Sequence, residues 1–106
     1  MKMVGGLIMA TCLLAATPAS AAAGDAVHGK KINAMCIGCH GIEGYRTAFP
    51  RVYSVPKIAG QQAVYIVNAL KAYQDGSRNH PSMRGIASSL SEQDMADLAA
   101  YYSSSK

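Results

Sequence analysis

The feature that most constrains this chain is a C-x-x-C-H motif at Cys36–His40, in which two residues separate the cysteines and a histidine follows directly. A disulfide between these cysteines could not staple the fold, because it would close only a trivially small loop. The spacing is instead typical of covalent haem attachment, in which each thiol adds to one vinyl group and the adjacent histidine lies under the iron. The motif therefore predicts haem c on Cys36 and Cys39, with His40 as an axial iron ligand.

The beginning of the chain has the pattern of an export signal. Lys2 is followed by an uncharged stretch over residues 3–23, whose most apolar part, residues 4–16, has the length of a signal-peptide core. Pro18 breaks this stretch, and Ala19-Ser20-Ala21 then fits the small-x-small pattern of a cleavage site. These features predict a secretory signal peptide.

We expect cleavage after residue 21, with residue 23 as the alternative, and a mature domain over residues 22–106. Cleavage after residue 21 would remove one basic residue and lower the formal charge from +4 to +3. We expect the domain to be periplasmic, because haem is attached to this motif outside the cytoplasm. If the apolar stretch stays uncleaved, its 21 residues are just long enough to act as a membrane anchor.

Helical patterns account for most of the mature chain, and no convincing strand pair is present, so the predicted fold class is all-α. We expect three main helices: from about Asp25 to Cys36, from Gln61 to Asp75, and from Ser91 onward. Ser91 begins a sequence that resembles a capping box. Gly29 inside the first helix costs about 1 kcal/mol relative to alanine, which predicts that another helix approaches it closely.

A long irregular segment, residues 41–60, connects the first two predicted helices and contains two prolines and three glycines. A loop of this length without a core of its own is unusual in a compact domain unless it wraps around something. An 85-residue exported domain without a useful disulfide is also marginal on core burial alone. Both observations indicate that a cofactor completes the core.

The sixth position of a haem iron requires a second ligand, and the mature chain offers three methionines: Met35, Met83 and Met95. Met35 adjoins the attachment motif, and Met95 lies in the apolar stripe of the third helix, where core packing is its expected role. Met83 lies in a polar stretch that we expect to be a loop, and a soft thioether there fits an axial ligand opposite His40. The rival ligand is His80, three residues earlier.

Two other sites compete with haem for this motif. A thioredoxin-like C-x-x-C would require βαβ patterning, which the sequence lacks. A structural zinc ion could take both cysteines and two of the histidines at positions 28, 40 and 80, but zinc ribbons usually pair two short ligand clusters, and no second cluster exists. Haem is therefore the favoured cofactor.

With these residues in place, the chain over residues 24–103 resembles the class I c-type cytochromes, close to the small c4/c5-like and c553-like bacterial proteins. Two features depart from the pattern: Asn33 is polar on a packed face, and residues 45–56 are unusually rich in aromatic and basic side chains. The matching pieces are Asp25-x-x-x-Gly29, Cys36–Gly41, Pro56–Gln61, Tyr65-Ile66, Ala69-Leu70, Tyr73, Gly76, Arg78, Met83, Leu90–Asp94 and Leu98–Tyr102.

The resemblance implies a small cytochrome c fold, with helices and long loops wrapped around one covalently attached haem. It implies that Gly29 lies where the N- and C-terminal helices cross, with Tyr101 packed on it. It further implies that the Pro56 carbonyl accepts the Nδ1–H of His40 and so fixes the ring, and that Met83 is the distal iron ligand.

The function that follows is electron transfer by a single haem between respiratory-chain partners, not catalysis, because two axial ligands leave no position for a substrate. The alternatives are a cytochrome subunit of an oxidoreductase, for example with a flavoprotein dehydrogenase, and a catalytic or gas-binding haem with an open position. The charge of +4 is too small to predict a nucleic-acid partner. Four basic residues are candidates to steer acidic redox partners: Arg46, Arg51, Lys57 and Arg84.

Overall fold

The computed structural model describes residues 5–6, 24–48 and 52–105, and nearly all of the expected signal peptide, including its cleavage site, lies outside them. The described part contains helices and no strand; Arg46 and Ser54 form an isolated antiparallel bridge. The prediction of an all-α fold is confirmed. None of the described helices combines the length and apolar character needed to cross a membrane. The helices are α1 (Ala26–Ile32), α2 (Ala34–His40), α3 (Ala63–Asp75), α4 (Pro81–Ala87) and α5 (Glu92–Ser104).

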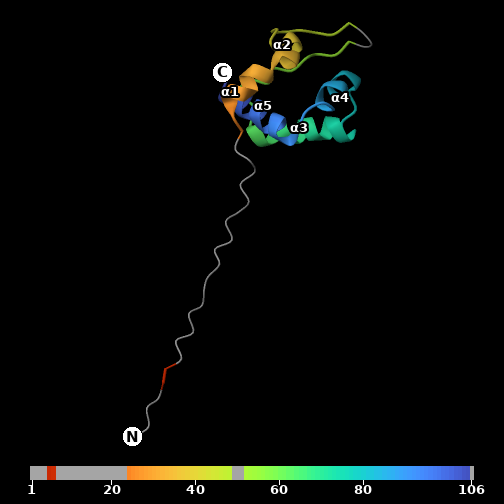
Figure 1. Cartoon of the computed structure of the whole chain (residues 1–106). Coiled ribbons are helices and arrows are strands. Elements are labelled where there is room, and N and C mark those ends of the chain that lie inside the picture. The colour runs from red at the N-terminus through yellow and green to blue at the C-terminus, as the bar shows by residue number, and fades with distance from the viewer. Residues whose placement is uncertain (1–4, 7–23, 49–51, 106) are drawn as a thin grey trace.

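The two ends of the domain meet where α1 crosses α5 (Figure 1). Gly29 lies at this crossing and is buried. A Cβ atom added to it would overlap the backbone oxygen of Asp97 and would lie 2.9 Å from the Cβ of Tyr101. The close approach predicted for Gly29 is therefore confirmed, since only a residue without a side chain fits there.

A buried carboxylate ties the same crossing together. Asp97 is 3% exposed and accepts three hydrogen bonds: from the backbone N–H of Asp25 at 2.7 Å, from Gln93 Nε2 at 2.8 Å, and from His28 Nδ1 at 2.6 Å. The backbone hydrogen bond from Asp25, followed by the Gln93 amide, holds the pKa of Asp97 below its ordinary value. This network joins residues far apart in the sequence and fixes where α1 begins.

The hydrophobic core lies mainly between α5 and α3. Met95 and Leu98 are the largest fully buried side chains, so the packing role predicted for Met95 is confirmed. The capping box is also confirmed: Ser91 Oγ accepts from the Asp94 N–H and the Asp94 carboxylate accepts from the Ser91 N–H, both at 3.0 Å.

Two helices differ from the sequence-based expectation. The first predicted helix is two helices, because the chain turns at Asn33, and the second of them runs on to His40. The carbonyl of Asn33 accepts the first hydrogen bonds of α2, from the N–H groups of Cys36 at 2.8 Å and Ile37 at 2.9 Å. The stretch around Met83, predicted as a loop, is the short helix α4, which begins with Pro81, a residue that needs no N–H partner at a helix start.

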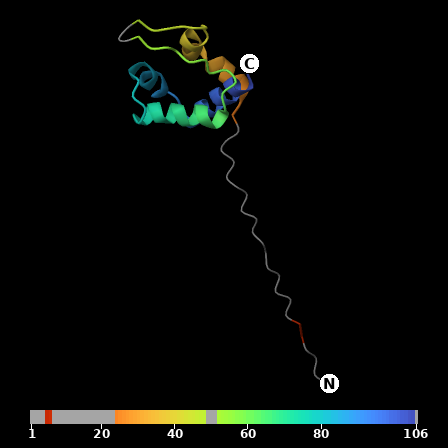
Figure 2. The same cartoon turned by 180° about the vertical axis from the view of Figure 1, so that it is seen from behind.

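Seen from behind in Figure 2, α2 and the segment that follows it lie on the opposite side of the molecule from α3. The helix α4 packs against one end of α3. The described parts of the irregular segment, residues 42–48 and 52–58, lie on the same side of the molecule as α2, and the second part leads back toward the start of α3. This arrangement leaves a space between α2 and its following segment on one side and α3 with α4 on the other.

Candidate functional site

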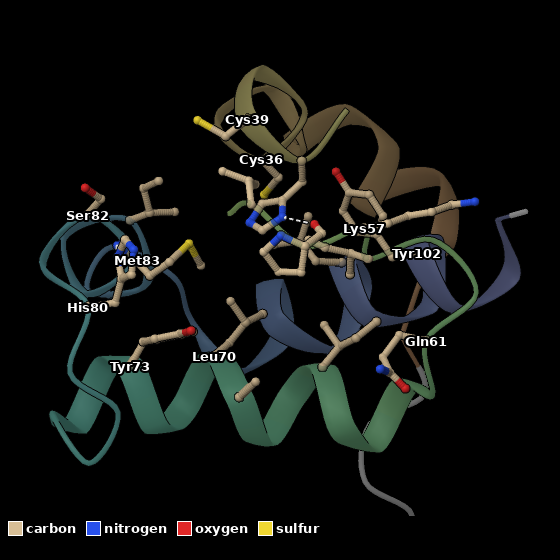
Figure 3. A pocket seen from close by; sticks show the side chains of 18 of the residues that line it. Cys36, Cys39, Lys57, Gln61, Leu70, Tyr73, His80, Ser82, Met83 and Tyr102 are labelled. Carbon is tan, nitrogen blue, oxygen red and sulfur yellow. Dashed lines mark hydrogen bonds between the residues drawn. The ribbon is translucent and has the colours of Figure 1, made fainter. Parts of the chain in front are cut away.

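That space is a cavity of about 450 Å³, within the range of roughly 300–1,000 Å³ usual for ligand sites. Figure 3 shows α2 above it, α3 below it and α4 at one end. The structure brings all five sequence-predicted site residues to its wall: Cys36, Cys39, His40, Pro56 and Met83.

The two cysteines lie on α2, three residues apart, which places them on neighbouring positions of one helix face. Both are free thiols in the described structure. Burial raises the pKa of the Cys36 thiol above its ordinary value. The site therefore presents two unpaired cysteines to one cavity, as an addition to two vinyl groups requires.

The imidazole of His40 lies at the end of α2, and its Nδ1 is 2.7 Å from the carbonyl oxygen of Pro56. A carbonyl can only accept, so Nδ1 carries the proton and donates. The neutral ring then has a lone pair on Nε2, the nitrogen free to bind a metal. The irregular segment thus holds His40 in the tautomer and orientation that a metal ligand needs.

Met83 lies on α4, half-buried, and packs against the hydrophobic core. In Figure 3 its thioether points into the cavity from the α4 end, while Cys36 and Cys39 approach from α2. The polar loop expected here is therefore corrected to a helix whose third residue faces the cavity. The proposed role of Met83 as a ligand does not depend on that difference.

An aromatic cluster at the α4 end of the cavity was not predicted. The ring centroid of His80 lies 4.4 Å from that of Tyr53 and 6.4 Å from that of Tyr73, and the Arg78 guanidinium lies 4.6 Å above the Tyr73 ring. All four residues line the cavity. The only signal in the sequence was the aromatic and basic character of residues 45–56, which does not say which partners these side chains meet.

Tyr102 also lines the cavity, and the sequence did not indicate its role there. The side chain is buried, and its hydroxyl has no well-formed hydrogen bond within the described part of the chain. Burial is the main cause that raises the pKa of Tyr102 to about 12, the nearby Cys36 adds to this, and the Asn33 side chain lowers it in part. A buried hydroxyl without a full partner indicates a wall that the protein alone does not complete.

The residues that a zinc site would need are not gathered. Within residues 5–6, 24–48 and 52–105, no three His, Cys, Asp or Glu side chains lie close enough to hold a metal ion. His28 is engaged with Asp97 at the helix crossing. By contrast, two free thiols, an imidazole with a free Nε2 and a thioether around an apolar cavity fit a flat macrocycle with a central iron.

Comparisons with known proteins show the family to which this chain is similar. The family model described as "Cytochrome c" matches residues 26–106. "Cytochrome c-554(548)" of Halomonas halodenitrificans is 44% identical over 85 residues, which cover 77% of this chain and 98% of that protein. "Cytochrome c4" of Pseudomonas aeruginosa is 38% identical over 100 residues, 94% of this chain and 48% of that protein.

A third relative is named for its redox role. The "Thiosulfate dehydrogenase electron acceptor" of Thiomonas intermedia is 37% identical over 73 residues, which cover 69% of this chain and 32% of that protein. The chain thus spans nearly the whole of one relative, about half of the cytochrome c4 and about a third of this acceptor.

Proposed function

This chain belongs to the cytochrome c family, and we propose that it is a periplasmic carrier of single electrons between respiratory-chain proteins. Like its relatives it is an electron-transfer protein with covalently bound haem c, not an enzyme. We propose that residues 1–21 are removed on export and that residues 22–106 form the working domain.

We propose that the Cys36 and Cys39 thiols add across the two vinyl groups of the haem, each S–H adding to one C=C bond so that no atom leaves. His40 Nε2 and the Met83 sulfur would be the axial ligands, and the Pro56 carbonyl would hold the His40 ring. When bound, the haem supplies an iron that cycles between ferric and ferrous. The observation that carries this assignment is that these five residues, four by their side chains and Pro56 by its carbonyl, line one cavity.

Two protein ligands on the iron account for a carrier rather than a catalyst. With His40 and Met83 both engaged, no axial position remains for a substrate. A thioether ligand also favours the ferrous state and raises the reduction potential relative to two nitrogen ligands. The helices and the irregular segment that line the cavity would hold both ligands in place in either oxidation state, which is what fast electron transfer needs.

Basic side chains near the cavity support docking of acidic redox partners. Lys57 lines the cavity and is exposed, and Arg46 and Arg84 are exposed as well; Arg51 lies outside the described residues. If these charges steer partners, the electron-transfer rate falls steeply as ionic strength rises, because salt screens exposed charges. A rate that is flat with salt would contradict steering.

The second candidate function is that of a cytochrome subunit bound permanently to an oxidoreductase. The name of the Thiomonas relative, an acceptor of electrons from a dehydrogenase, favours it. A stable complex in native gels, or co-purification with a dehydrogenase such as a flavoprotein, would support the subunit. Isolation as a free monohaem protein would support the mobile carrier.

Export to the periplasm of a host that matures c-type cytochromes tests the main proposal. We expect the intact mass to exceed that of the cleaved chain by one haem, and the ferric protein to show the absorption band of sulfur-bound iron. The band should disappear in Met83→Ala and persist in Met95→Ala, because Met95 is fully buried in the core. An unpigmented protein, or a band that survives Met83→Ala, would contradict the assignment.

A further inference from the structure

We propose that His80 is a positioning residue: its imidazole holds Met83 on the first turn of α4 and secures that turn beneath the irregular segment. The inference rests on the proposed ligation of the iron by Met83. It assigns to His80 a task different from that of an iron ligand.

The first contact is a helix cap. His80 precedes α4 with extended backbone (φ −146°, ψ 108°), and its Nδ1 accepts a hydrogen bond from the Met83 N–H at 3.3 Å. The first turn of any helix leaves its N–H groups without intrahelical partners. Here the capped N–H belongs to the residue whose side chain faces the cavity, so the cap acts directly on the backbone of Met83.

The second contact joins three segments of the chain. The His80 ring packs on Tyr53 from the irregular segment, with centroids 4.4 Å apart, and meets the edge of Tyr73 from α3 at 6.4 Å. Tyr53 is itself held in place, because its N–H donates to Thr47 Oγ1 at 3.0 Å and its carbonyl accepts from the Thr47 N–H at 2.9 Å. His80 therefore links the start of α4 to the part of the irregular segment that these two hydrogen bonds hold together.

The length of α4 makes this anchoring necessary. The helix has seven residues, Pro81–Ala87, and an isolated helix of that length is not stable in water. Its orientation, and with it the direction of the Met83 side chain, depends on contacts with the rest of the fold. The helix packs against α3, and the Gln74 side chain donates a hydrogen bond to the Ala87 carbonyl at its C-terminal end at 3.1 Å, while His80 makes the contacts described above at its N-terminal end.

The hydrogen-bond pattern also argues against His80 as the iron ligand. Because Nδ1 accepts from the Met83 N–H, the neutral ring carries its proton on Nε2. Neither nitrogen then has a free lone pair for a metal. The two roles predict opposite results, since a ligand would leave the sulfur band absent from the wild type, whereas a positioning residue needs that band to be present.

Binding of free imidazole to the ferric haem protein measures how firmly Met83 is held. Imidazole must displace the sulfur, so its apparent affinity rises with the fraction of molecules in which that bond is open. Loss of a helix cap shifts such an equilibrium by roughly three- to ten-fold. We expect His80→Ala to bind imidazole tighter than wild type by that factor and to show a weaker sulfur band.

Two further variants separate the contacts. His80→Asn keeps a side-chain acceptor at the cap but loses the ring, and Tyr53→Leu keeps the cap but loses the stacking partner; each should increase imidazole affinity less than His80→Ala. The matched control is Ser91→Ala, which removes the cap of α5, a different helix from the one that carries Met83. It should lower the melting temperature and leave imidazole affinity unchanged.

The proposal would be overturned if the imidazole affinity of His80→Ala were within two-fold of that of the wild type. It would also be overturned if Ser91→Ala increased the imidazole affinity by the same factor as His80→Ala. If His80→Ala fails to mature, His80→Asn and Tyr53→Leu decide it: wild-type affinity in both overturns it, and tighter binding in either supports it. A wild-type protein without the sulfur band would contradict the ligation by Met83 instead, so the two failures can be told apart.

Discussion

The helix crossing and the haem cavity differ in how completely the polypeptide buries their side chains and satisfies their polar groups. At the crossing of α1 and α5, Gly29 is buried and Asp97, 3% exposed, accepts three hydrogen bonds; in the adjoining core Met95 is fully buried. Around the cavity, Met35 on α2 and Tyr65 on α3 are about half exposed, and the Tyr102 hydroxyl lacks a well-formed partner within the described residues. The difference shows which part of the fold the polypeptide completes by itself.

The crossing is a closed set of contacts between the two ends of the domain, and it requires nothing beyond the chain. The cavity side consists of the short helices α2 and α4, the irregular segment and a wall of apolar side chains that line the cavity. A small domain buries too little apolar surface to tolerate such a space, so the group that fills it contributes to stability as well as to function. The four variants below test this division, from the largest expected effect to the smallest.

Replacing both haem-binding cysteines, as Cys36→Ser/Cys39→Ser, should have the largest effect. We expect no covalent haem, no visible absorption, and loss of cooperative unfolding, because the cavity side would lack its filling group. Intact mass and circular dichroism as a function of temperature measure this. Ile37→Ser, at an exposed variable position of the same motif, is the control and should keep the haem; a folded, cooperative double variant would contradict the division.

Met95→Ala tests the part of the fold that requires nothing beyond the chain. The side chain is fully buried, so its truncation should lower the free energy of unfolding by about 2–5 kcal/mol through lost burial and a new cavity. Denaturant unfolding of the haem protein measures the loss. The sulfur band should be unaffected, and its disappearance would mean that this residue, not the cavity methionine, faces the iron.

Gly29→Ala tests the crossing itself. The added Cβ would overlap the Asp97 carbonyl oxygen, which belongs to the backbone and can move only with α5. We expect a loss of about 1–3 kcal/mol in the free energy of unfolding, measured by denaturant. In the control Gly85→Ala, a Cβ meets nothing within 4 Å, so stability should be unchanged or slightly higher. Equal effects in the two variants would contradict the close approach.

Tyr102→Phe should have the smallest effect at neutral pH, because the lost hydroxyl makes no well-formed hydrogen bond. The difference in stability between the variant and the wild type appears at alkaline pH. Folding raises the pKa of this phenol from 10.0 to about 12, so its neutral form stabilises the fold fully below pH 10 and this contribution is lost as the pH rises toward 12.

Unfolding free energies measured at intervals between pH 8 and pH 12 would therefore fall more for the wild type than for Tyr102→Phe. The other tyrosines serve as an internal reference, since they are present in both proteins. Parallel curves for the two proteins would show that Tyr102 is not buried in the folded state.

Local sequence was sufficient for the features whose physical cause is local. The N-cap at Asp25, the capping box at Ser91 and the left-handed end of α3 at Gly76 each depend on a few adjacent residues, and the capping box was predicted from them. The C-x-x-C-H spacing likewise determined the cofactor, because the chemistry of attachment requires two thiols and an imidazole at fixed separation. The family resemblance extended this to Gly29 and to the hydrogen bond between His40 and Pro56.

Tertiary structure decided what depends on residues distant in the chain. The bond between His28 and Asp97 joins residues 69 positions apart, and the contact between His80 and Tyr53 joins the irregular segment to α4, so no periodicity could reveal either. The helix α4 was missed for the same reason, since seven residues with a proline at the start carry too weak a local preference to be recognised without their neighbours. Local rules thus determined where the chain caps its helices and binds its cofactor, whereas the shape of the cavity that receives the cofactor arose only when those helices packed together.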